Sequence, residues 1–202
     1  MAAKRIDPQT TALLLIDLQN DALHPKGAYG RAGLALDCLS SLPARLLPLC
    51  QSLRRKGGWV FATHFTILEG KQGEPIMTEH TRQLRPFLQR GDFHRGSWGH
   101  NLVDALGDVD LHIDKFTFSA FEMSPLEWAL RQVKVDTVIL AGITTPISVV
   151  ATMRDAVLRD FRGIVLEDGV AALDDKQHRS ALAEMAGIAM VRSCADAMAL
   201  IG

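Results

Sequence analysis

The sequence has few cysteines and no excess of charge of either sign. Its three cysteines, Cys38, Cys50 and Cys194, are odd in number and widely spaced, which argues against a disulfide framework and a cysteine-based metal site. We expect three buried thiols. Lys and Arg number 22 against 23 Asp and Glu, and no basic stripe appears that would bind nucleic acid.

Long apolar runs are also missing. The longest, such as residues 12–16 and 137–141, are far too short to cross a bilayer. Residues 1–10 are polar and contain no apolar signal-peptide region. The sequence therefore predicts a cytoplasmic protein that has no membrane partner.

The composition predicts one well-packed domain over residues 1–202. Of the 202 residues, 48% are hydrophobic and 22% are charged, and a chain of this length buries roughly two thirds of its unfolded surface. No repeat, low-complexity tract or linker divides the sequence.

Short apolar runs alternate with segments of helical period along the chain. Residues 69–99 are rich in Gly, Pro and charge without a clear period, so we expect a long surface excursion, of the kind that often lines a site. The expected strands are residues 11–17, 59–65, 109–113, 137–141, 163–166 and 188–191; the expected helices are residues 42–55, 124–133, 146–159 and 176–186, followed by a short terminal helix.

This alternation predicts an α/β fold with a mostly parallel sheet that helices cover on both faces. Ligands of such sheets bind beyond the carboxyl ends of the strands. Three places are selected, after Ile16, Ile113 and Ala141, and each of them has an unusual feature.

Asp17 ends the first apolar strand. A carboxylate in this position is partly desolvated, so it needs a partner or a raised pKa; capping of the following turn is the alternative. Asp21, a few residues later, fits a turn or capping residue.

Lys115 stands among aromatic residues at the end of another expected strand. It is either a surface lysine whose stem lies along apolar groups or a cation held beside a buried carboxylate. Pairing with Asp17 would make it functional.

Residues 142–148 join an expected strand to an expected helix. Thr145 can serve as the N-cap and Pro146 suits the first helical position, which places Ser148 in the first turn. Backbone N–H groups lack helical partners there and could hold an oxyanion or activate a nucleophile. An ordinary helix start explains the same residues.

Together these segments resemble the isochorismatase-like cysteine hydrolase superfamily, in its amidohydrolase branch. The resemblance runs through nearly the whole chain, and five motifs in the family's order carry it: Leu15-Ile-Asp-Leu-Gln-Asn-Asp21, Gly96-Ser-Trp-Gly99, Lys115 with Ser119-Ala-Phe121, residues 142–148, and Thr152-Met-Arg-Asp-Ala156.

The resemblance implies a three-layer, doubly wound (Rossmann-like) sheet of about six parallel strands and a catalytic triad of Asp, Lys and Cys. Carried over, Asp17 is the general acid or base, Lys115 is its electrostatic partner, and Ser148 occupies the position of the nucleophilic cysteine. A cis peptide is expected at Ile143-Thr144, and the oxyanion hole would use backbone N–H groups of Thr144 and Ser148.

Ser148 is the main departure from the family. A thiol, with a pKa near ~8.5, is far easier to activate than a serine hydroxyl, and no histidine is evident as a dedicated base. The serine fits an engineered Cys-to-Ser variant, a natural serine version of weak or altered activity, or an isochorismatase, which lacks the cysteine and protonates a vinyl ether through the aspartate.

The resemblance also indicates the pocket. Gln19, His64, Trp98 and Phe118 are its candidate lining residues, because each lies within or beside a matching segment; Arg31 is a further cation that could meet a substrate carboxylate. The Asp-x-His metal motif of the nicotinamidase branch is absent around His64, so no metal is expected. No Gly-x-Gly-x-x-Gly follows the first strand, which argues against a nucleotide cofactor.

Three functions follow from these observations. The first is hydrolysis of a C–N bond in a small amide, urea or carbamoyl compound through an acyl-enzyme, with Ser148 as a possible point of inactivation. The second is vinyl-ether hydrolysis with Asp17 as general acid, and the third is a non-catalytic binding role. The partner in each case is a small molecule, and the resemblance implies a homo-oligomer.

Overall fold

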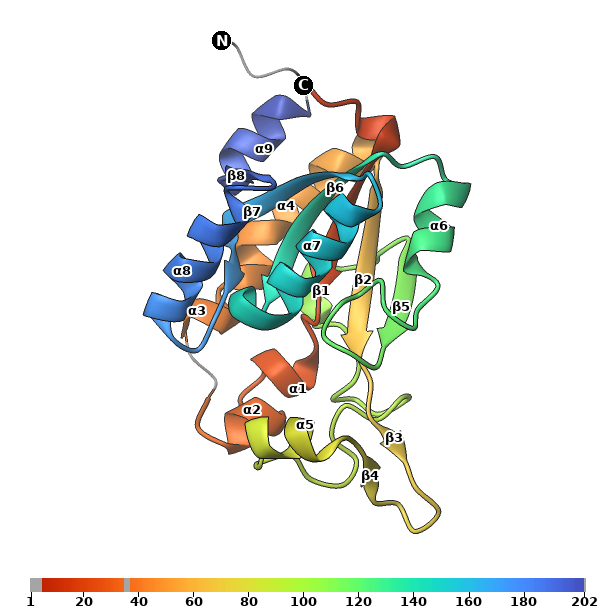
Figure 1. Ribbon diagram of the computed structural model, residues 1–202, viewed down its shortest axis with the longest axis vertical. Coiled ribbons are helices and arrows are strands. Elements are labelled where there is room, and N and C mark those ends of the chain that lie inside the picture. The colour runs from red at the N-terminus through yellow and green to blue at the C-terminus, as the bar shows by residue number, and fades with distance from the viewer. Residues whose placement is uncertain (1–4, 35–36, 202) are drawn as a thin grey trace.

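The computed structural model describes residues 5–34 and 37–201 (Figure 1). Residues 1–4, part of the polar N-terminal segment, lie outside the described residues. The elements are β1 (Thr11–Ile16), α1 (Asn20–Leu23), α2 (Ala28–Arg31), α3 (Asp37–Ser40), α4 (Leu42–Arg55), β2 (Trp59–Phe65), β3 (Leu68–Glu69), β4 (Pro75–Ile76), α5 (Glu79–Leu84), β5 (Leu111–Lys115), α6 (Leu126–Gln132), β6 (Thr137–Ile143), η3 (Thr145–Val149), α7 (Val150–Leu158), β7 (Arg162–Ala171), α8 (Asp175–Met185), β8 (Met190–Arg192) and α9 (Cys194–Leu200), with short 3-10 turns η1 (Pro8–Thr10) and η2 (Asp104–Leu106).

The sheet confirms the predicted three-layer α/β fold. Six strands pair in the order β5-β2-β1-β6-β7-β8, and every pair is parallel. Strand β1 is buried along its whole length. Leu13 and Leu15 belong to the core under α4 and α9, whereas Leu14 and Ile16 belong to the core under α6, α7 and α8. Because successive side chains of a strand point to opposite faces, the continuous apolar run of β1 supplies both cores.

The strand order reverses between β1 and β6. The chain places β2 and β5 on one side of β1 and places β6, β7 and β8 on the other. Crevices in open α/β sheets form at such a reversal, beyond the carboxyl ends of the strands. Asp17 follows β1 and η3 follows β6, so both lie at this position.

The excursion of residues 69–99 contains more structure than expected. It includes strand β4, which pairs in antiparallel fashion with β3, and helix α5, and Figure 1 shows these elements beyond the end of the main sheet. The hairpin strands have two residues each and α5 has no buried residue. The hairpin and α5 therefore show no apolar periodicity in the sequence, and prediction of helices and strands depends on that periodicity.

The helix predicted over residues 146–159 is divided. A single π-helical turn, η3, comes first, and α7 follows it. Thr144, not Thr145, is the N-cap residue, and its side chain makes no capping bond. The prediction for Thr145 was wrong because its hydroxyl lies 2.9 Å from Nδ1 of His178 on α8, so a tertiary contact occupies it.

The cysteine prediction is confirmed at two positions and wrong at the third. Cys50 and Cys194 are buried, but Cys38 is exposed, since α3 lies at the surface and Cys38 borders an open groove with Arg45 and Asp175. No helix within residues 5–34 and 37–201 is both long and apolar enough to cross a lipid bilayer.

Candidate active site

Asp17 turns the chain out of β1 and directs its carboxylate across the sheet edge. Its φ is 56°, in the left-handed region that Asp tolerates better than most residues. The Asp17 N–H donates to the Thr63 carbonyl at 3.1 Å, and the Thr63 hydroxyl donates to Asp17 Oδ1 at 3.1 Å. Strand β2 thus holds both the backbone and the side chain of Asp17.

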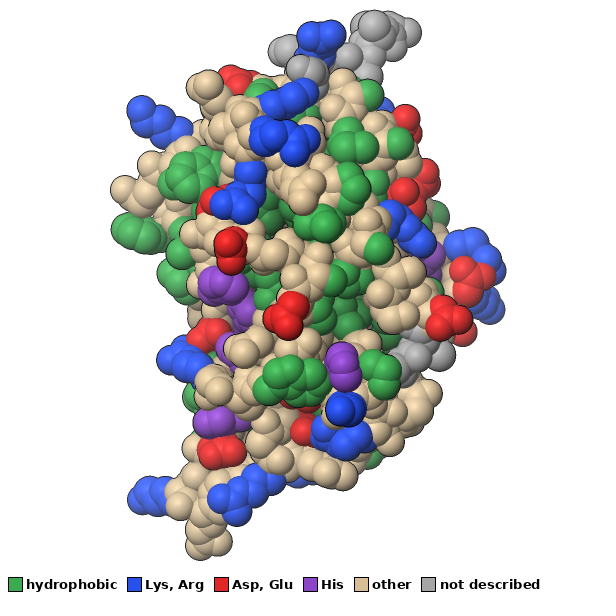
Figure 2. All heavy atoms as spheres, turned by 180° about the vertical axis from the view of Figure 1, so that it is seen from behind, with side chains coloured by type: hydrophobic (Ala, Val, Ile, Leu, Met, Phe, Trp, Pro, Cys, Tyr) green, Lys and Arg blue, Asp and Glu red, His purple; other side chains and the backbone are tan. Residues whose placement is uncertain are grey.

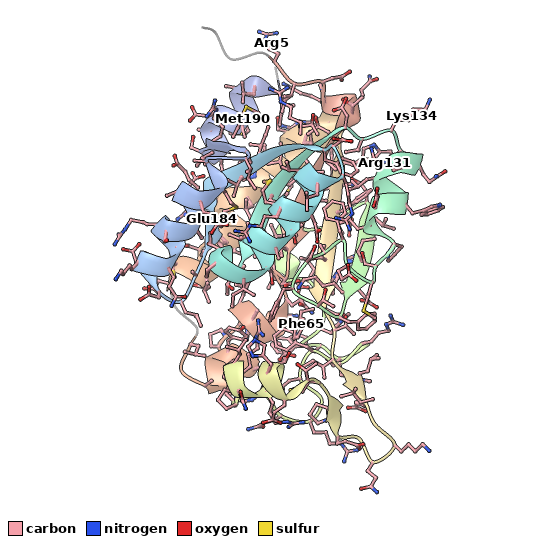
Figure 3. The ribbon with its side chains drawn as sticks, in the orientation of Figure 1. Arg5, Phe65, Arg131, Lys134, Glu184 and Met190 are labelled. Carbon is pink, nitrogen blue, oxygen red and sulfur yellow. The ribbon has the colours of Figure 1, made fainter. Side chains whose placement is uncertain are left out.

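Lys115 reaches Asp17 from β5, across the intervening strand β2. Its side chain is fully buried, and Nζ lies 2.8 Å from Asp17 Oδ2 and 5.3 Å from the centre of the Phe65 ring. Figure 3 shows Phe65 at the end of the sheet that faces the excursion. Burial lowers the pKa of the Lys115 ammonium, and the Asp17 charge opposes that shift. Of the two interpretations of Lys115, the structure shows the cation held beside a buried carboxylate.

Ser148 comes to the same point from η3. The Lys115 ammonium donates to Ser148 Oγ at 3.4 Å and to the Thr117 carbonyl at 3.0 Å. The approach of η3 depends on Gly142, whose φ is 116° and where a Cβ atom would lie 2.1 Å from the Ile16 carbonyl oxygen. The Ile143–Thr144 peptide bond is cis, as expected. The three side chains predicted to be catalytic are therefore in one place.

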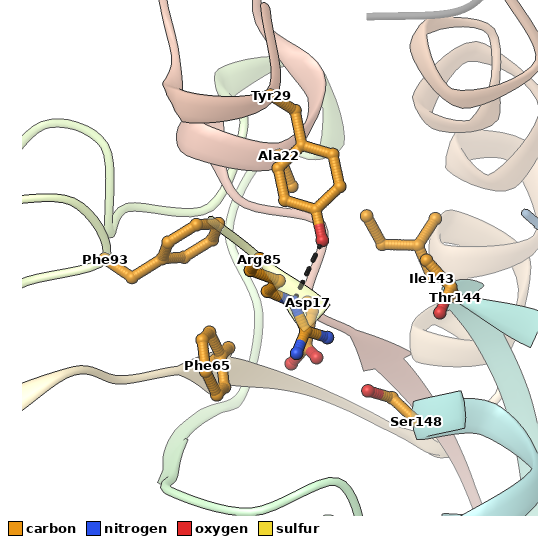
Figure 4. Close-up of a pocket in the computed structure, with 9 residues that line it drawn as sticks. All are labelled: Asp17, Ala22, Tyr29, Phe65, Arg85, Phe93, Ile143, Thr144 and Ser148. Atoms are coloured by element: carbon orange, nitrogen blue, oxygen red, sulfur yellow. Dashed lines mark hydrogen bonds between the residues drawn. The ribbon is translucent and has the colours of Figure 1, made fainter. Parts of the chain in front are cut away.

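A small cavity opens at this place. Figure 4 shows the Ser148 hydroxyl facing it from one side and aromatic rings bordering it from the other. Its lining residues are Asp17, Ala22, Tyr29, Phe65, Arg85, Phe93, Ile143, Thr144 and Ser148. The Thr144 hydroxyl is buried without a hydrogen-bond partner among the described residues, so the cavity wall that includes Ser148 contains an unsatisfied polar group.

Arg85 is the lining residue that sequence reasoning missed. It follows α5, which ends at Leu84 because Pro86 disfavours the helical conformation for the residue before it. Its guanidinium lies 5.3 Å from the Phe65 ring centre, and its Nε donates to the Tyr29 hydroxyl at 3.3 Å. In the sequence, the Arg85-Pro86 pair is a signal for the end of a helix, but no sequence pattern places Arg85 near Asp17.

Of the four predicted pocket residues, none is among the cavity's lining residues. Gln19 is buried and ties β1 to β2, since its side-chain amide exchanges hydrogen bonds with the backbone of Phe65 at 2.8 and 3.0 Å. Trp98 is 49% exposed and packs edge-on against His24. Phe118 stands nearer, 5.7 Å from the Arg85 guanidinium.

The structure also shows the surroundings of two other polar residues considered in the sequence, Arg31 and Asp21. Arg31 forms an ion pair with Asp92 and does not line the cavity. Asp21 is buried, and its carboxylate accepts hydrogen bonds from the backbone of Ala28 and Phe93 at 3.1 and 2.7 Å. This agrees with its interpretation as a turn or capping residue.

His64, on β2, belongs to a network that also contains His100 and His112. Its ring stacks on His100, and its Nε2 lies 2.9 Å from Nδ1 of His112. The Thr66 hydroxyl is 2.8 Å from His100 Nε2, which lies 3.4 Å from Asp114 Oδ1. Figure 2 shows histidine, acidic and basic side chains together along one edge of the molecule. Among the described residues, no group of three or more His, Cys, Asp or Glu side chains has a geometry suited to a metal ion.

This network should make folding stability sensitive to acid. Burial lowers the pKa of His100 to about 4 and also lowers the pKa of His64. An unfolded histidine titrates near ~6.5, so between about pH 6.5 and 4 the unfolded chain binds protons that the folded chain does not. The free energy of unfolding is therefore expected to fall as the pH drops through this window.

Urea unfolding at pH 7.5 and 5 measures this effect. A His100→Gln variant should lose less stability on acidification than the unsubstituted chain, while His80→Gln, at an exposed position, should keep the pH dependence of the unsubstituted chain. An unchanged pH dependence in His100→Gln would contradict the assignment.

Comparison with known proteins places this geometry in a family. Residues 11–196 match the isochorismatase domain. The chain is 32% identical over 195 residues to the ureidoacrylate amidohydrolase RutB of Methylobacterium radiotolerans, covering 89% of this chain and 74% of that protein. It is 31% identical to the RutB protein of Caulobacter vibrioides, covering 81% and 77%.

A solved structure agrees along the full chain. A cysteine hydrolase from Pseudomonas syringae pv. phaseolicola superposes with a TM-score of 0.83 at 25% identity, covering 100% of this chain and 98% of that one. The domain match, the relatives and the shared fold lead to one conclusion. The chain belongs to the isochorismatase family and is an isochorismatase-like hydrolase.

Proposed function

We propose that this protein hydrolyses the C–N bond of a small amide or ureido compound, with Ser148 at the nucleophile position. The observation that carries the proposal is the meeting of the Asp17 carboxylate, the Lys115 ammonium and the Ser148 hydroxyl beside one small cavity. The similarity to ureidoacrylate amidohydrolases supports the same bond type.

The proposed reaction proceeds through an acyl-enzyme. The Ser148 oxygen attacks the substrate carbonyl, and its proton passes to Asp17. Backbone N–H groups of Thr144 and Ser148 stabilise the oxyanion. Asp17 then protonates the leaving nitrogen, the C–N bond breaks, and ammonia or an amine departs. Water, deprotonated by Asp17, hydrolyses the ester and restores the Ser148 hydroxyl.

Lys115 has an electrostatic role in this scheme. Its ammonium forms an ion pair with Asp17 and so holds that carboxylate in place, and its contact with Ser148 Oγ favours the deprotonated nucleophile. No histidine of the described residues lies within hydrogen-bond distance of Ser148 Oγ. Asp17 is therefore the base of the scheme, and a hydroxyl is a harder group for a carboxylate to deprotonate than a thiol.

Ser148 itself favours a second candidate function, vinyl-ether hydrolysis. That reaction needs Asp17 as a general acid and needs no nucleophilic side chain. It predicts turnover by the unsubstituted chain that Asp17→Asn abolishes and Ser148→Ala leaves unchanged.

A paired ammonia-release screen tests the first proposal. Small amides, ureas and carbamoyl compounds are offered to the unsubstituted chain, to Ser148→Cys and to Ser119→Cys, a control at another buried serine that does not line the cavity. We expect turnover to be highest in Ser148→Cys, since the thiolate is the stronger nucleophile at neutral pH, and Ser119→Cys to match the unsubstituted chain. If Ser148→Cys releases ammonia from none of the compounds, this would count against C–N hydrolysis, and vinyl-ether substrates would be tested next.

A further inference from the structure

The Arg85 guanidinium lies against the cavity without an acidic partner. Its Nη1 atom is buried and has no hydrogen-bond acceptor, while its Nε is engaged by the Tyr29 hydroxyl. Within residues 5–34 and 37–201, no carboxylate lies within 4.0 Å of the Arg85 nitrogens. Buried charged donors are costly when unpaired, so this N–H is suited to an acceptor that a ligand supplies.

The charges around the cavity indicate the sign of that ligand. Asp17 and Lys115 form a close pair whose charges cancel, and Arg85 adds one uncompensated positive charge. This charge reaches the catalytic centre, because it contributes to lowering the pKa of Lys115. An anionic group beside Arg85 would leave the occupied site neutral.

The surroundings of Arg85 favour a carboxylate. Phe65 and Phe118 lie 5.3 and 5.7 Å from the guanidinium carbon, and their rings keep water from this side of the group and so strengthen its electrostatic interactions. A guanidinium offers planar, paired donors that match the two oxygens of a carboxylate. The cavity is small, which restricts a ligand that reaches both Arg85 and Ser148 to a short one.

We propose that Arg85 binds the substrate's carboxylate, and that the substrate is a short amido or ureido acid. Its carboxylate lies at Arg85 and its scissile carbonyl lies at Ser148. The position of the carbonyl rests on the proposed function, whereas carboxylate binding by Arg85 does not. Arg85 thereby selects acids over neutral amides.

Calorimetric titration of the unsubstituted chain with two matched probes tests this selection. The probes are 3-ureidopropionate and its uncharged methyl ester, methyl 3-ureidopropanoate, which has the same single ureido group. The acid should bind at least about tenfold more tightly, as expected for one charge-assisted hydrogen-bonded contact. Arg85→Met should lose this preference and Arg85→Lys should keep part of it. Arg82→Met, at an exposed arginine of α5, should bind as the unsubstituted chain does.

Three results would overturn the proposal: equal affinity for the two probes, no measurable binding of the acid, or an unchanged preference in Arg85→Met. Thermal unfolding of Arg85→Met shows that the variant is folded, and Arg85→Lys provides the readout if it is not. If Ser148→Cys releases ammonia from both probes at the same rate, the carboxylate site is refuted while C–N hydrolysis stands. Acid-selective binding, with no turnover by Ser148→Cys of these probes or of any compound in the screen, counts against hydrolysis and leaves the carboxylate site in place.

Discussion

A Ser148→Cys variant is expected to be alkylated by iodoacetamide at that position while Cys50 and Cys194 stay unmodified. Position 148 borders the cavity, and its side-chain atom lies 3.4 Å from the Lys115 ammonium, a setting that lowers the pKa of a thiol. Burial raises the pKa values of Cys50 and Cys194 to about 12. Both remain protonated at neutral pH, and both are shielded from the reagent.

Peptide mapping by mass spectrometry at pH 6.5 measures the rates at all four thiols. Cys38 is exposed and serves as the reference within the same molecule. The thiol introduced at position 148 should react at least about tenfold faster than Cys38, because more of it is thiolate. Adding Lys115→Met should remove most of that advantage. If position 148 reacts no faster than Cys38, the site does not activate a nucleophile there.

Asp17→Asn is expected to have two large effects. In the Ser148→Cys background it should lower turnover by about 10²- to 10⁴-fold, the usual contribution of a general acid–base group. It should also lower the free energy of unfolding by about 3–5 kcal/mol, the usual cost of leaving one member of a buried ion pair alone. Lys115 is fully buried and Asp17 is its acidic partner at 2.8 Å.

Two further variants separate the effects on turnover and stability. Adding Lys115→Met to Asp17→Asn removes the unpaired cation, so stability should recover in part while turnover stays low. Asp21→Asn changes another buried carboxylate, one that does not line the cavity; it should cost stability and spare the chemistry. Turnover that survives Asp17→Asn would remove Asp17 from the mechanism and favour its structural interpretation.

Both experiments change residues that were predicted from the sequence to be part of the site, each for a different reason. Asp17 was selected by its place at the end of an apolar strand, a property of the local sequence. Ser148 was selected by the helix start after Pro146 and by the family resemblance. For Lys115, the residues alone left a surface position and a buried ion pair open, and only the order β5-β2-β1 decided between them.

The sequence by itself determined the α/β class, the positions of the long elements and the three strand ends that meet at the site. Apolar runs and helical periods are local patterns, and parallel strands place their carboxyl ends at one edge. Only the tertiary structure brought Arg85 to the cavity, left Trp98 outside it and turned Gln19 into a tie between strands. The positions of Arg85 and Trp98 depend on how residues 69–99 fold beyond the end of the sheet (Figure 1), and the Gln19 bonds join residues far apart in the sequence. No local period records such contacts.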